Sequence, residues 1–138
     1  MSNAHRFVPV AAWTDRRHRR GLAGERAALR YLTACGWQVE AHRFRLERHD
    51  LDLVMRRGRL VAFVEVKTRR SLRCGSPLES VTALKRRLIE RVALGWRLRH
   101  GRPGDAYRFD LVAVTDLGGG RYEVEHVVDA WRMTWSPC

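Results

Sequence analysis

Three residues in the middle of the chain, Asp52, Glu65 and Lys67, have side chains and a spacing that could do chemistry. The segments that carry them flank Arg57-Gly58-Arg59, and a two-residue turn with Gly58 first would pair them as a hairpin. That register places Asp52 directly opposite Glu65, with Lys67 two residues further along the same face. The other face would be core and would collect Leu51, Leu53, Met55, Ala62, Val64 and Val66.

Opposed carboxylates in a sheet lie with their Cβ atoms roughly 5 Å apart and destabilise it unless one holds a proton or a cation bridges them. Oxygen ligands favour Mg²⁺ or Mn²⁺, and the Lys67 ammonium could orient water or stabilise charge on a phosphate. This combination is typical of metal-dependent phosphodiester hydrolysis. The alternative is a solvated face with a cross-strand ion pair.

The surroundings of the three residues favour the site. Glu65 and Lys67 end an otherwise apolar segment, 60–64, so they close a buried strand rather than an exposed ribbon. Acids kept inside a basic patch indicate metal ligands within a phosphate-binding groove. The neighbouring cations are Arg56, Arg57, Arg59, Arg69, Arg70, Arg73, Arg86 and Arg87.

The composition sets the class of protein. A chain of 138 residues with 45% hydrophobic residues forms one domain, and its net charge of +12 suits a partner that is a polyanion, most often nucleic acid. Only two of its 27 cations are lysines, Lys67 and Lys85. No segment is apolar for long enough to span a membrane, and no secretory leader is evident. Three scattered cysteines favour a reducing compartment, so we expect a cytoplasmic protein.

The elements that must position these residues follow from periodicity and turn signals. We expect a basic, flexible arm over residues 1–20 and a single domain over 21–138. Within that domain the patterns predict a helix over 21–35, strands over 37–45, 51–56 and 60–67, a helix opened by the capping box Ser76-Pro77-Leu78-Glu79 and running to about residue 100, and strands over 107–115 and 122–128. The order α-β-β-β-α-β-β predicts an α/β (α+β sandwich) fold, a mixed β-sheet flanked by helices.

The spacing of Asp52 and Glu65-Val66-Lys67 resembles the PD-(D/E)xK nuclease signature of type II restriction enzymes and archaeal Holliday-junction resolvases. The chain is more similar still to the YraN-type bacterial proteins of uncharacterised function, over about residues 21–128. The matching motifs are Gly24-Glu25 with Ala28, Leu32 and Gly36, then Asp52-Leu53-Val54, the segment Phe63 to Arg69, Lys85, and Arg108-Phe109-Asp110.

The resemblance implies a restriction-endonuclease-like core with Mg²⁺ or Mn²⁺ held by Asp52, Glu65 and Val66. It also implies that Lys67 is the catalytic lysine and that Glu25 completes the site. From position alone, the first-turn alternative, an acid that favours the helix dipole, is the preferred interpretation of Glu25. Two departures stand out: His49-Asp50 replaces the usual Gly-Glu, and Arg43 replaces an asparagine.

We therefore expect a magnesium-dependent endonuclease-like protein that binds nucleic acid, with structured or branched DNA as substrate. Candidate phosphate-binding residues are Arg45, Arg69, Arg70, Lys85 and Arg86. For Lys85 a surface role along the helix is an equal alternative.

The rival functions are a nucleic-acid-binding protein that retains the fold without turnover and a basic assembly protein. DNA versus RNA and monomer versus homodimer stay open. His42, His49 and His126 lack metal-ligand spacing and are predicted to be incidental, and Asp110 is predicted to pair with an arginine.

Overall fold

The computed structural model describes residues 19–70 and 75–133. Its elements are α1 (Arg19–Ala34), β1 (Gln38–Leu46), β2 (His49–Arg57), β3 (Leu60–Arg69), a 3₁₀ helix (Pro77–Ser80), α2 (Ala83–His100), β4 (Ala106–Gly118) and β5 (Arg121–Trp131). The predicted order is confirmed. The helix α1 already begins at Arg19, two residues inside the expected arm, and the rest of that arm and Arg73 lie outside the described residues.

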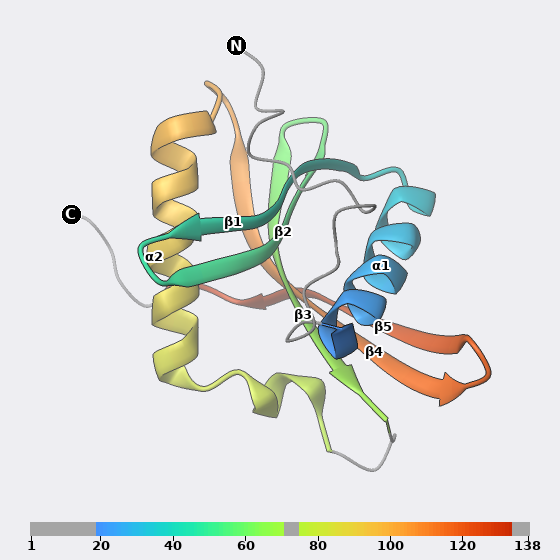
Figure 1. Ribbon diagram of the computed structural model, residues 1–138. Helices are drawn as coiled ribbons and strands as arrows, with labels where there is room; N and C mark the ends of the chain where they lie inside the picture. The colour runs from blue at the N-terminus through green and yellow to red at the C-terminus, as the bar shows by residue number, and fades with distance from the viewer. Residues whose placement is uncertain (1–18, 71–74, 134–138) are drawn as a thin grey trace.

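The strands form one sheet in the order β1-β2-β3-β4-β5. Every neighbouring pair is antiparallel except β3 and β4, which are parallel and are connected through α2. The two helices cover opposite faces of this mixed sheet (Figure 1). The expected α+β sandwich is therefore confirmed.

Each helix seals its own apolar core against the sheet. On the α1 side Ala28 and Leu32 pack on Leu53, Met55 and Val64. On the α2 side the buried residues include Phe44, Leu51, Val54, Phe63, Ile89, Val92 and Trp96. Because both faces of the β2–β3 hairpin are buried along most of its length, its exposed polar side chains lie at the turn and at the end where the strands separate.

The predicted hairpin register is confirmed by the pairs Arg57↔Leu60, Met55↔Ala62 and Leu53↔Val64. The expectation that Leu51 shares a face with Leu53 is wrong, because Leu51 belongs to the α2-side core. The exchange of faces coincides with Arg43 in β1, whose φ of 53° is left-handed and interrupts the usual alternation of a strand.

The start of the second helix also differs from the prediction. The residues of the expected capping box form a separate 3₁₀ helix, and the Ser76 side chain makes no capping hydrogen bond. Val81 is extended, and Thr82 is the true N-cap of α2, where its hydroxyl accepts a hydrogen bond from the Lys85 amide at 3.2 Å. This restart changes the phase of the helix, so Leu84, expected in the core, is 61% exposed. No helix among the described residues is both long and apolar enough to cross a membrane.

Candidate functional site

The acid pair Asp52 and Glu65 lies where β2 and β3 separate. The β2–β3 ladder reaches Leu53↔Val64, whereas β3 continues to Arg69 paired with β4 alone (Figure 1). At this fork the Asp52 carboxylate accepts a hydrogen bond from the backbone N–H of Val66, at 2.8 Å. Beyond the last backbone pair of β2 and β3, the Asp52 side chain thus provides the hydrogen bond between the two strands. This bond holds the Asp52 carboxylate beside Glu65.

The two carboxyl groups perturb each other. Burial, followed by repulsion from Glu65, raises the pKa of Asp52 well above its usual value. Burial likewise raises the pKa of Glu65, an effect that Lys85 partly offsets. Two such acids close together favour either a shared proton or a bound cation. The structure thus contains the arrangement expected from the sequence: two neighbouring carboxyl groups that a proton or a cation would stabilise.

Both lysines of the chain lie at this fork. The Lys85 Nζ lies 3.1 Å from Glu65 Oε1, and the Lys85 side chain is 43% exposed. Lys67 is exposed two residues beyond Glu65 on β3 and forms no ion pair with any residue in the ranges 19–70 and 75–133. The two lysines line one open cleft of about 970 Å³.

A third acid, Glu25, reaches the same region from α1. It is buried, and its carboxylate accepts hydrogen bonds from His42 Nε2 at 2.9 Å and from Arg43 Nη2 at 2.8 Å. Burial acts to raise the pKa of Glu25, but these two partners outweigh it and hold the pKa below its usual value. The charge of Glu25 adds to the repulsion felt by both Asp52 and Glu65.

Glycine at position 24 lets α1 come close enough to deliver Glu25. A Cβ at Gly24 would lie 1.9 Å from Thr68 Oγ1, on the stretch of β3 that also carries Glu65 and Lys67. The backbone of α1 at Gly24 therefore packs directly against the Thr68 side chain of β3, and a residue with a Cβ would clash there.

The donor set suits a hydrated, oxygen-loving cation. Asp52 and Glu65 supply the carboxylates, and Val66 can contribute only through its backbone because its side chain is apolar. Mg²⁺ is commonly held by one or two carboxylates and keeps several waters. Within the described part of the chain, no group of three or more His, Cys, Asp and Glu side chains has metal-binding geometry. The Glu25 carboxylate already binds His42 and Arg43, so it acts on the acid pair through its charge and is not one of the metal ligands.

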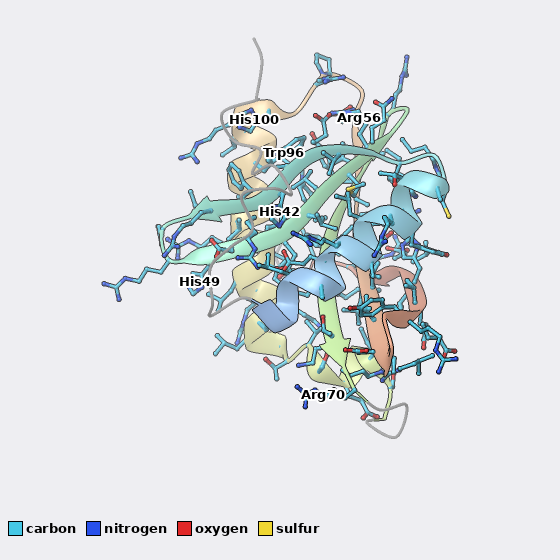
Figure 2. The ribbon with its side chains drawn as sticks, turned by 45° about the vertical axis from the view of Figure 1, so that its right-hand side comes forward. His42, His49, Arg56, Arg70, Trp96 and His100 are labelled. Atoms are coloured by element: carbon cyan, nitrogen blue, oxygen red, sulfur yellow. The ribbon has the colours of Figure 1, made fainter. Side chains whose placement is uncertain are left out.

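The candidate phosphate-binding residues divide into two groups. Lys85, Arg69 and Arg70 line the cleft. The Arg69 guanidinium is largely buried and donates to Thr115 Oγ1 and the Gly75 carbonyl, whereas Arg70 is exposed just after β3 (Figure 2).

The other two candidates do not line the cleft. Arg45 is exposed on β1, where it donates to the Glu47 carbonyl at 3.2 Å. Arg86 donates to the Val81 carbonyl at 3.1 Å and lies over the ring of Trp131. The cationic wall of the cleft is therefore narrower than the sequence suggested.

Two residues of this region were not identified from the sequence. His42 is fully buried and points from β1 toward α1 (Figure 2), and neighbouring Arg43 reaches the same carboxylate. Successive strand residues normally point to opposite faces, and the left-handed backbone of Arg43 removes that restriction. The expectation that His42 is incidental is therefore wrong.

A second buried acid, Asp110, lies on β4. It accepts a bidentate pair of hydrogen bonds from Arg108, both at 2.8 Å, which confirms the predicted arginine partner. It also accepts a bond from His126 at 2.7 Å, so His126 is likewise not incidental. This fully satisfied cluster is structural.

The fold and the fork together define a class of protein: a basic α+β domain with an acid pair and two lysines where two interior strands of a mixed sheet separate. The sequence profile of the uncharacterised protein family UPF0102 matches residues 24–114, and the chain belongs to that family. It is 41% identical over 111 residues to a UPF0102 protein of Rhodococcus jostii, covering 80% of this chain and 94% of the relative. It is 34% identical over 128 residues to one of Geobacter sulfurreducens, covering 93% of this chain and all of the relative.

Proposed function

We propose that this protein is a divalent-metal-dependent nuclease that hydrolyses phosphodiester bonds in nucleic acid, with structured or branched DNA as its substrate. The observation that carries the proposal is the partly buried acid pair Asp52–Glu65, flanked by the two lysines of a chain that otherwise uses arginine for every cation. A purely structural acid pair would be costly here, because burial raises the pKa of both groups and repulsion from Glu65 raises the pKa of Asp52 further.

The residues of the fork have separate roles in this proposal. Asp52 and Glu65, with the Val66 backbone, would hold Mg²⁺ or Mn²⁺, which supplies a Lewis acid and an acidified water. Lys67 faces the cleft without an ion-pair partner among the described residues, so its ammonium is available to orient the attacking water or the phosphate. Water attacks phosphorus and gives up a proton to solvent, the bond to the leaving oxygen breaks, and that oxygen takes up a proton from solvent. Lys85 and Arg70 bind phosphate on the cleft wall.

The experiment is a cleavage panel of duplex, flap, four-way junction and single-stranded DNA, with matched RNA, in Mg²⁺ or Mn²⁺. We expect nicking of the branched substrates, a loss of about 100-fold or more in Lys67→Ala, and retained binding. Glu123→Gln, an exposed acid on β5, is the matched control and should cleave normally. Equal cleavage by wild type and Lys67→Ala would indicate contamination and refute the enzyme proposal.

Binding without cleavage would favour the second candidate, a nucleic-acid-binding protein that retains the site. The ion pair of Glu65 with Lys85 is the observation in its favour, since it neutralises the acid without a metal. Both candidates require affinity that falls with salt, by about tenfold or more between roughly 50 and 200 mM for two or three phosphate contacts. An affinity that does not change with salt would contradict both the nuclease and the nucleic-acid-binding candidate, and would favour the assembly protein.

A further inference from the structure

The position of Lys85 in its own helix is electrostatically unfavourable. It is the third residue of α2, in the turn that follows the Thr82 cap, and the first turn of this helix contains no acid. A helix N-terminus carries partial positive charge, so a cation there is disfavoured. Glu65, across the fork on β3, compensates through the 3.1 Å ion pair.

The same contact occupies an oxygen that a metal would need. Glu65 is buried, with its side chain only 9% exposed, and Lys85 Nζ lies within hydrogen-bond distance of Oε1. An ammonium and a divalent cation on one carboxylate repel each other, and this fork is only partly screened by water. The two cations therefore compete for Glu65.

The Lys85 side chain can move into the cleft when it is displaced from Glu65. It is partly exposed, lines the cleft, and has a flexible four-carbon stem. An ammonium released from Glu65 remains on the cleft wall near Arg70, as an unpaired donor for a phosphate oxygen.

We propose that Lys85 is a resident counter-ion of the acid pair that a divalent cation displaces, and that the displaced ammonium then binds a phosphate of the nucleic acid. Metal and nucleic acid thus strengthen each other's binding, and this coupling must be reciprocal. The inference deepens the proposed function and rests on it for the choice of ligand.

The first test is calorimetric titration of Mn²⁺ into the full-length protein at fixed pH and salt. Lys85→Met should bind Mn²⁺ about tenfold tighter than wild type, because the competing cation is gone, whereas Lys85→Arg should stay close to wild type. Lys67→Met is the matched control: it removes the same charge from the same cleft but breaks no ion pair among the described residues, and it should change the affinity far less. Equal gains in the two methionine variants would show a general charge effect and overturn the inference.

The second test measures DNA affinity with and without Ca²⁺, used in place of the catalytic metal. Ca²⁺ should tighten wild-type binding by several-fold, and this enhancement should be lost in Lys85→Met and kept in Lys67→Met. Persistence of the full enhancement in Lys85→Met would refute the coupling. Absence of cleavage with these results intact would refute only the nuclease proposal, whereas cleavage with unchanged Mn²⁺ affinity in Lys85→Met would refute only this one.

Discussion

The contact of Gly24 with Thr68 gives the sharpest structural prediction, because it determines how closely α1 approaches the strand that carries the site. In Gly24→Ala the new Cβ would lie 1.9 Å from Thr68 Oγ1 and 3.0 Å from Thr68 Cβ. Overpacking of this kind costs about 1–3 kcal/mol. The higher helix propensity of alanine returns about 0.5–1 kcal/mol. We therefore expect the free energy of unfolding to fall, by up to about 2.5 kcal/mol.

The assay is urea unfolding of a double-mutant cycle. Thr68→Ala removes the hydroxyl and the methyl group that crowd position 24 and leaves only its own Cβ, 3.0 Å from the new one, so Gly24→Ala should cost much less in that background. The coupling between the two sites should be about 1–3 kcal/mol, within the range of residues in contact. A stabilising Gly24→Ala in the wild-type background, or additive effects, would refute the close approach of α1 to β3.

Three further predictions concern the helix cap and the buried acids. Thr82→Ala should lower the free energy of unfolding by about 1 kcal/mol, whereas Ser76→Ala, which removes no capping bond, should leave it unchanged in the same urea experiment. Hydrogen bonding to Arg56 lowers the pKa of Asp105 from 3.8 to about 2, so this acid stabilises the fold at neutral pH and its contribution is lost as the pH falls from about 4 to about 2. Asp105→Asn should flatten that part of the stability–pH curve, and an unchanged curve would contradict the pairing. The raised pKa of Asp52, caused by burial and then by Glu65, has the opposite sign: it lowers the stability of the metal-free protein as the pH rises. Asp52→Asn should therefore raise the melting temperature without metal at pH 7 and remove the increase produced by Mn²⁺; a lower melting temperature at that pH would contradict the repulsion.

The sequence predicted the sheet and the acid pair because both depend on local rules. The register follows from Gly58 at the turn, and Asp52 lies beside Glu65 because the hairpin count admits no other partner without exposing one apolar face. The element order followed from periodicity alone.

The sequence did not predict features that depend on backbone departures from those rules. Arg43 joins His42 on Glu25 only because its φ is positive, and alternation along the strand gives no sign of this. The start of α2 was misplaced because Ser76 satisfies a capping pattern, while the extended backbone of Val81 forces the helix to begin again at Thr82. That restart positions Lys85 against Glu65, so the ion pair could not be predicted either.

The most direct test of the whole account is an anomalous difference map from crystals loaded with Mn²⁺. We expect a peak at the fork, about 2.1–2.2 Å from a carboxylate oxygen of both Asp52 and Glu65, with the Lys85 ammonium no longer on Glu65. Crystals with no peak at the fork at millimolar Mn²⁺, and with Lys85 still paired to Glu65, would contradict it.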